Sequence, residues 1–235
     1  PPSGGHWFGT DELGRDVFSR VLVAVGVSMR VAVVSVGFAV VVGVAVGVLA
    51  GYRGGWIDTI FMRIVDVMFA FPVLLLALAV VAILGPGTTT TILAIGIVYT
   101  PVFARVARAS TLGVRVEPFV QISRAMGTGN LYILARHIVP NIAGPLIVQT
   151  SLSLAFAILS EAALSFLGLG IQPPQPSLGR MIFDSQGFVT MAWWMAVFPG
   201  AAIFVIVLAF NLVGDGLRDV LDPKQRTMIE ARSKR

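Results

Sequence analysis

Long apolar runs separated by short polar segments dominate the sequence. A helix needs about 20 apolar residues to cross a bilayer, and only a helix or a closed barrel satisfies its backbone there. Five runs approach or exceed this length, and they cover residues 31–50, 67–84, 89–107, 142–169 and 191–213. The pattern therefore predicts an all-α, polytopic membrane protein with five visible spans.

Three of these spans contain residues that are unusual inside a membrane helix. The third contains Pro101 and Arg105, the fourth contains Glu161 and the fifth contains Pro199. An ionised acid at the bilayer centre costs roughly 3 kcal/mol on insertion scales, so Glu161 must face protein or water, or be neutral. Two interpretations are open: Glu161 lines a translocation path, or it pairs with a polar group on a neighbouring helix or lies at the external interface.

The composition agrees with lipid as the main solvent. The chain is 56% hydrophobic and 12% charged, whereas soluble domains average roughly 25% charged residues. It contains no cysteine and only two histidines, His6 and His137, which excludes disulfides and metal–thiolate sites. The net charge of +5 fits the basic loops of a membrane protein better than a nucleic-acid-binding surface.

The basic residues are unevenly distributed between the two predicted sides of the membrane. Four of the seventeen lie on one side or at the entrance of the first span, namely Arg15, Arg20, Arg30 and Arg180. The other thirteen are placed in the cytoplasm, because cytoplasmic loops are enriched in Lys and Arg. Residues 1–30 then form an external segment, and residues 31–235 form the transmembrane domain with a cytoplasmic tail at 214–235. An external start with five spans predicts an earlier, sixth helix.

The polar segment 115–140, between the third and fourth spans, is the most informative part of the chain. Pro118 suits the first turn of a short helix. An apolar stripe follows at helical spacing: Phe119, Ile122 and Met126. Gly127 suits a left-handed helix end, and residues 131–138 form a second short helix that ends before Pro140. The pattern fits an amphipathic hairpin in the lipid headgroups or a helix that inserts into a cleft on another protein.

The spacing in this segment resembles the loop by which permease subunits of bacterial ATP-binding-cassette (ABC) importers dock onto their ATPases. The family pattern is Glu-Ala-Ala, three residues, Gly, nine residues, Ile-x-Leu-Pro. Gly127 and Pro140 keep that spacing, although other residues replace Glu-Ala-Ala, Ile and Leu. The resemblance implies that these residues couple to an ATPase: Phe119, Gln121, Ile122, Ser123, Arg124, Ala125, Met126, Gly127 and Pro140. Glu161-Ala162-Ala163 also spells the motif, but it lies in an apolar span and lacks the following glycine.

Four further stretches carry the resemblance along nearly the whole chain, specifically to the dipeptide, oligopeptide and nickel permease branch. They are HWFGTDELGRDVFSR at 6–20, GYRGGWIDTIFMRIVDVMFAFP at 51–72, LSFLGLGIQPPQPSLG at 164–179 and NLVGDGLRDVLDP at 211–223. The resemblance implies the type I importer transmembrane fold, with six helices per subunit. It also implies a bacterial inner-membrane location, a second homologous permease, one or two cytoplasmic ATPase subunits and an external substrate-binding protein.

Chemistry for an independent activity is missing from the sequence. The chain has no phosphate-binding loop of the G-x-x-x-x-G-K-[ST] type, and no nucleophile, base and orienting group can be assigned. We therefore expect no catalytic residue, no metal and no cofactor in this chain, with ATP and Mg²⁺ bound by the partner ATPase. The alternative is a self-contained secondary transporter or channel, which would need internal repeats or ion-coordinating polar residues inside its spans.

Charged pairs at helical spacing occur at the two ends of the transmembrane domain. Arg63 and Asp66 are three residues apart and are expected to pair locally, with Asp58 on the same cytoplasmic helix start. In the tail, a like-charged pair and an opposite-charged pair both sit at i, i+4: Asp215 with Asp219, and Arg218 with Asp222. The tail therefore fits either a solvated helix or a contact with a basic partner surface.

Overall fold

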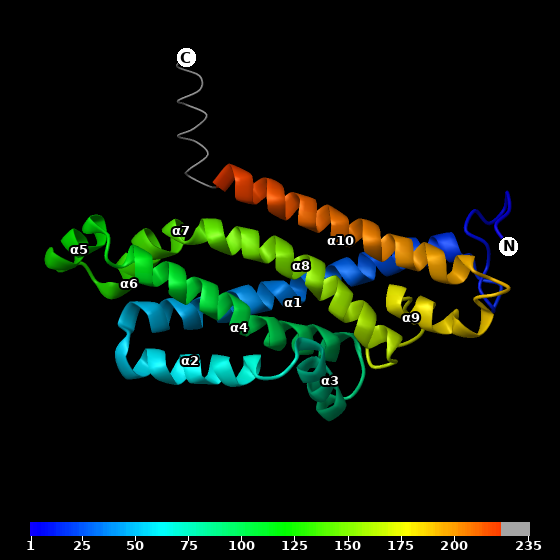
Figure 1. The fold of residues 1–235 in the computed structure, drawn as a ribbon, viewed down its shortest axis with the longest axis horizontal. Helices are drawn as coiled ribbons and strands as arrows, with labels where there is room; N and C mark the ends of the chain where they lie inside the picture. Colours follow the sequence, from blue (N-terminus) through cyan, green and yellow to red (C-terminus); the bar gives the residue numbers. More distant parts are fainter. Residues whose placement is uncertain (222–235) are drawn as a thin grey trace, which may run out of the picture.

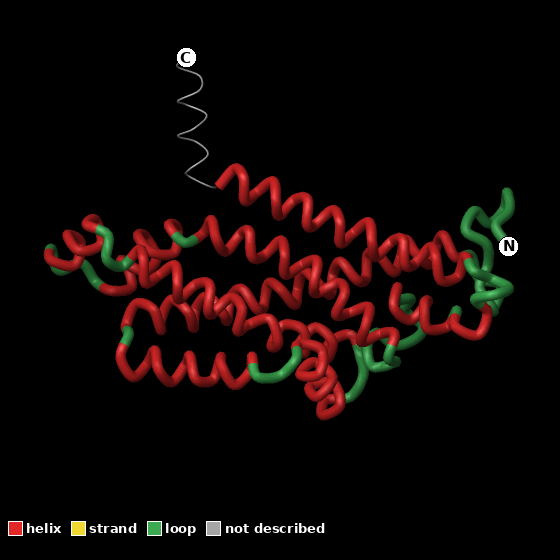
Figure 2. The backbone as a smooth tube through the Cα atoms, viewed as in Figure 1, coloured by secondary structure: helices red, strands yellow, loops and turns green. Residues whose placement is uncertain are grey.

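The computed structural model describes residues 1–221 of the chain. They form an elongated helical bundle in which four helices are long and apolar enough to cross a membrane (Figure 1). These are α1 (Val17–Arg53), α4 (Thr88–Val114), α8 (Ala143–Phe166) and α10 (Trp194–Leu221). In the described part, loops are short and no strand is present apart from two isolated bridges (Figure 2). The all-α fold is confirmed.

The second apolar run does not form one straight helix. It begins in the last turn of α2 (Gly55–Phe69) and continues in α3 (Val73–Leu84), and the two helices are bent by 93°. The break lies at Pro72, which is the N-cap of α3 with an extended ψ of 135°. Proline disfavours helical conformation in the preceding residue. The apolar run 67–84 is therefore continuous in hydropathy but is broken into two helices.

Helix α1 begins well before the predicted start at Val31. Asp16 caps it, because a side-chain oxygen of Asp16 accepts a hydrogen bond from the Ser19 N–H at 2.8 Å. Arg30, which limits the charge-free run, is accommodated within the helix. At about 1.5 Å per residue, the 37 residues of α1 extend beyond the roughly 30 Å hydrocarbon core.

A close helix contact joins α1 to α4 through three glycines spaced four residues apart. They are Gly43, Gly47 and Gly51. A Cβ atom on Gly43 would lie 2.6 Å from the Thr100 carbonyl oxygen, and one on Gly51 would lie 3.0 Å from the Arg108 oxygen. Small residues allow helix backbones to approach in this way, and van der Waals packing and interhelical hydrogen bonds are what hold membrane helices together.

Ion pairs connect α2 to α4 and correct the expected local pair. Asp66 contacts Arg105 at 2.9 Å rather than Arg63, and Asp58 receives two hydrogen bonds from Arg108 at 2.5 and 2.6 Å. Spacing along one helix favours a local pair, but α4 lies alongside α2 and offers its own arginines. The acidic residues of α2 therefore bind arginines of α4 and hold the two helices together.

The two ends of the bundle carry different short elements (Figure 1). At one end lie α5 (Pro118–Ala125), α6 (Asn130–Ile133), a π-helical turn (Leu134–Ile138) and α7 (Val139–Asn141). At the other lie the N-terminal segment, α9 (Leu178–Asp184) and a 3₁₀ turn (Gln186–Phe188). Asp222, and with it most of the predicted tail and the Arg218–Asp222 pair, lies outside the described residues.

Candidate functional site

Helix α5 presents its apolar stripe outward instead of packing it on the bundle. Phe119, Ile122 and Met126 are 39%, 60% and 79% exposed. Pro118 occupies the first turn, as expected, and Val120 on another side of α5 is fully buried. One buried side chain thus holds the helix to the bundle and leaves an apolar face available for a partner.

Gly127 ends α5 in the left-handed conformation that the sequence predicts. Its φ is +78°, its N–H donates to the Arg124 carbonyl at 3.0 Å, and the Thr128 N–H donates to the Ser123 carbonyl at 3.1 Å. A Cβ atom at Gly127 would meet nothing within 4 Å. The requirement for glycine within this chain is therefore conformational and not steric.

The second half of the loop is fastened by polar contacts that sequence reasoning missed. The Tyr52 hydroxyl donates to Asn130 Oδ1 at 2.8 Å, which ties the end of α1 to the start of α6. The Asn141 side chain donates to the His137 carbonyl at 2.6 Å, next to Pro140. Tyr52 and Asn130 are 78 residues apart, so no local pattern could have linked them.

The predicted coupling residues do not share one surface. Ser123 Oγ donates to the Phe119 carbonyl at 2.8 Å and lies 3.4 Å from His137 Nε2, so it is tied within the loop. Gln121, Arg124 and Ala125 line a cavity against the ends of α1 and α4. At 100° per residue this second face is roughly opposite the apolar stripe. The candidate site therefore has an exposed apolar face, which is the predicted docking face, and a cavity face.

Glu161 is fully buried between α1, α8 and α9. Ser28 Oγ of α1 donates to its carboxyl group at 2.6 Å, and Ser165 and Ser177 donate to the other oxygen at 2.7 and 3.1 Å. Of the two interpretations left open, pairing with polar groups of neighbouring elements describes this arrangement. A role in the translocation path stays a prediction.

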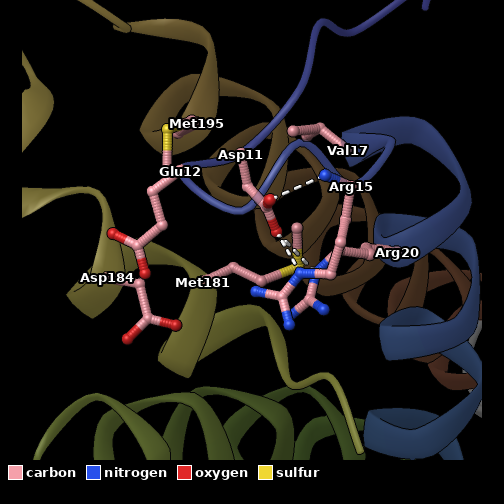
Figure 3. A pocket seen from close by; sticks show the side chains of 8 residues that line it. All are labelled: Asp11, Glu12, Arg15, Val17, Arg20, Met181, Asp184 and Met195. Atoms are coloured by element: carbon pink, nitrogen blue, oxygen red, sulfur yellow. Dashed lines mark hydrogen bonds and ion pairs between the residues drawn. The ribbon is translucent and has the colours of Figure 1, made fainter.

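The first family-like stretch, residues 6–20, lies at the other end of the bundle (Figure 1), where Asp11, Arg15 and Arg20 line a pocket with residues of α9 and α10 (Figure 3). Asp11 accepts a hydrogen bond from Arg15 at 2.7 Å and lies 3.5 Å from Arg20, and Trp194 Nε1 donates to the Thr10 carbonyl at 3.0 Å. Hydrogen bonds from Ser19 lower the pKa of Asp16 below its usual range. Among residues 1–221, no three His, Asp or Glu side chains are placed to hold a metal ion. The ion pair between Asp11 and Arg20 fastens the N-terminal segment to α1, and the hydrogen bond from Trp194 fastens it to α10.

Comparison with known proteins identifies relatives over most of the chain. Residues 43–227 match the family described as binding-protein-dependent transport system inner membrane component. The chain is 47% identical over 226 residues to the dipeptide transport system permease protein DppC of Alkalihalophilus pseudofirmus, covering 96% of this chain and 74% of that protein. It is 46% identical over 226 residues to the glutathione transport system permease protein GsiD of Pectobacterium atrosepticum, covering 96% and 75%.

Solved structures share the fold at low sequence identity. The inward-facing MetNI methionine ABC transporter superposes with a TM-score of 0.72 at 19% identity, covering 87% of this chain and 97% of that chain. An amino acid ABC transporter with histidines gives 0.62 at 15% identity, covering 86% and 94%. The type I importer transmembrane fold is thereby confirmed. The chain belongs to the inner membrane components of binding-protein-dependent transport systems and is a permease subunit of an ABC importer.

Proposed function

We propose that this permease subunit couples to a separate cytoplasmic ATPase through residues 117–140 and imports short peptides or similar small solutes. The single observation that carries the coupling is the exposed apolar stripe of α5, Phe119, Ile122 and Met126, at one end of the bundle. A helix that offers i, i+3 and i+7 apolar side chains is suited to a hydrophobic groove on a partner.

The solute class is proposed from the relatives. Those compared above are named for dipeptide and glutathione transport, and both solutes are short peptides with free charged groups. The permease branch that the sequence resembles also includes transporters of oligopeptides and nickel, so these solutes remain candidates. The binding-protein-dependent family favours this assignment over a self-contained transporter.

The proposed mechanism is alternating access driven from outside this chain. ATP and Mg²⁺ bind to the partner ATPase, whose closure moves α5. The two homologous permeases then rock open toward an external substrate-binding protein that releases its solute between them. Hydrolysis resets the inward-open state. In this scheme α5 transmits force and supplies no catalytic group.

The orientation can be tested with single cysteines, because the chain contains none of its own. Leu131 is 80% exposed on the loop and Ser3 is exposed at the opposite end. With the charge bias placing the loop inside, Ser3→Cys is expected to react with an impermeant thiol reagent in spheroplasts. Leu131→Cys is expected to react only after permeabilisation. Labelling of position 131 but not position 3 before permeabilisation would invert the topology.

Replacing Gly127 by glutamate tests the coupling itself. The φ of +78° costs a non-glycine residue about 1–2 kcal/mol, and the side chain adds a charge beside the proposed docking face. Gly127→Glu is expected to stay in the membrane at normal amounts, to lose solute uptake and to retain less ATPase on purification of the complex.

Gly129→Glu is the matched control. Gly129 has a φ of −61° and open space around it, so the same side chain is added two residues away without backbone strain. Its uptake and ATPase retention are expected to change far less. Normal transport by Gly127→Glu with the ATPase still bound would reject the docking assignment and favour the interfacial hairpin.

A further inference from the structure

A cavity of about 660 Å³ lies behind α5, against the ends of α1 and α4. Its lining includes three arginines from three different helices or helix ends, Arg53, Arg115 and Arg124, together with Tyr52 and Gln121. The volume falls in the range of about 300–1,000 Å³ that is usual for small-molecule sites. Among the residues that the structure describes, no carboxylate lines the cavity, so the charge of this lining is strongly positive.

Two of the three arginines are held in place by neutral partners. Arg115 Nη1 donates to the Gly51 carbonyl at 2.7 Å, and the Arg124 guanidinium lies 5.1 Å from the centroid of the Tyr52 ring. Tyr52 is itself fixed by its hydrogen bond to Asn130. Within residues 1–221, none of the three arginines forms a salt bridge. Their positive charge is therefore left for a ligand.

The position of the cavity on α5 separates it from the docking face. Gln121 and Arg124 line the cavity, whereas Phe119, Ile122 and Met126 point roughly the opposite way at 100° per residue. If the apolar stripe were bound in a groove of a partner, the cavity face of α5 would still point toward the ends of α1 and α4. The occupant is thus expected to approach from the membrane surface.

We propose that this cavity binds the phosphate group of an anionic phospholipid from the cytoplasmic leaflet. Arginine side chains suit phosphate oxygens because their planar donors can bind two oxygens at once. Basic pockets at the cytoplasmic ends of membrane helices take lipid headgroups of this kind. The inference rests on the cytoplasmic placement of residues 115–140 proposed above. A bound phosphate would bridge Arg53 at the end of α1 to Arg124 on α5 and so fix the base of the coupling loop.

The test is lipid binding to the assembled transporter, with this chain, its partner permease and the ATPase purified together in detergent. Short-chain phosphatidylglycerol and phosphatidylcholine are titrated separately, and bound lipids are counted by native mass spectrometry. Phosphatidylglycerol is expected to bind in preference. The Arg53→Gln/Arg124→Gln double variant is expected to weaken that binding about 25-fold, since each basic residue at the surface contributes about fivefold.

Arg63→Gln/Arg136→Gln is the matched control, because it removes two exposed arginines that do not line the cavity. Its phosphatidylglycerol binding is expected to stay close to that of the parent. If both double variants bound phosphatidylglycerol equally weakly, the loss would reflect the general surface potential, and the proposed lipid site would be wrong. Displacement of the lipid by excess inorganic phosphate, with phosphate alone filling the site, would overturn the lipid assignment in favour of free phosphate.

Two outcomes separate this inference from the coupling proposal. Loss of the ATPase from the Arg53→Gln/Arg124→Gln complex, with unchanged phosphatidylglycerol binding, would show that an acidic group of the ATPase fills the cavity and would overturn the lipid site. Phosphatidylglycerol binding by the Gly127→Glu complex is expected to persist even where the ATPase is lost. Normal ATPase binding by Gly127→Glu would reject the docking face alone and leave the lipid result standing.

Discussion

Leucine at position 47 is expected to force α1 away from α4 and so to destabilise the bundle. A Cβ atom at Gly47 would collide with the Ala104 carbonyl oxygen and would lie 2.9 Å from the Arg108 backbone nitrogen. Backbone atoms cannot rotate away as a flexible side chain can, so the two helices must separate. Overpacking costs about 3 kcal/mol at the upper end of its usual range, against a total stability of roughly 5–15 kcal/mol.

The measurement is the amount of folded chain in the membrane and its thermal unfolding in detergent. Gly37→Leu is the matched control, because Gly37 lies on the same helix and has no atom within 4 Å of its Cβ position. It is expected to accumulate and unfold like the parent chain. Parent-like accumulation and unfolding of Gly47→Leu would mean that the backbones of α1 and α4 are not in close contact at this glycine.

This contact shows how far hydropathy predicts the fold. Apolar length locates α1, α4, α8 and α10 because a span must be largely apolar whatever its neighbours are. Hydropathy says nothing about which helices touch. The Gly43, Gly47 and Gly51 spacing is visible in the sequence and is typical of close helix contacts. Thr100 and Ala104 of α4 are also small residues four apart, but Ser151 and Ala155 of α8 have the same spacing, so spacing alone does not identify the partner helix.

The coupling loop is predictable where local chemistry decides the structure. The helix start at Pro118 and the left-handed Gly127 depend on the residues themselves, and both are present. The cavity face is not predictable in this way, because it forms only when α5 folds back toward Arg53 at the end of α1, which is distant in the sequence. The family resemblance groups Arg124 with the docking residues, whereas the structure places it in the cavity lining.

The surroundings of Glu161 could not be predicted for the same reason. Ser165 lies one helical turn away and could have been anticipated, but Ser28 and Ser177 reach the carboxyl group from α1 and from the N-cap of α9. Small hydroxyl residues are common in membrane helices and serve packing in most cases. Nothing in their spacing marks these two as partners of a buried acid.

Alanine at position 161 is expected to destabilise the chain and to loosen α9. Three serine hydroxyls would lose their acceptor in a fully buried site, and a buried polar group left unsatisfied costs about 1–3 kcal/mol. Ser177 also caps α9 by accepting a hydrogen bond from the Arg180 N–H. The loss should therefore appear as a lower unfolding temperature and as faster hydrogen exchange in Leu178–Asp184, measured by mass spectrometry on the detergent-solubilised protein.

Glutamine at the same position separates this structural role from a role in the translocation path. Its carbonyl oxygen can accept from Ser165 and Ser177, and its amide can donate to Ser28 once that hydroxyl rotates. Glu161→Gln is expected to cost about 1 kcal/mol, to keep α9 protected from exchange and to transport solute nearly as well as the parent. A Glu161→Gln chain that is stable and keeps α9 protected, yet fails to take up solute, would show that the carboxyl group acts on the solute itself. In that case the three serines position a residue of the translocation path, and the hypothesis that Glu161 has a purely structural role is wrong.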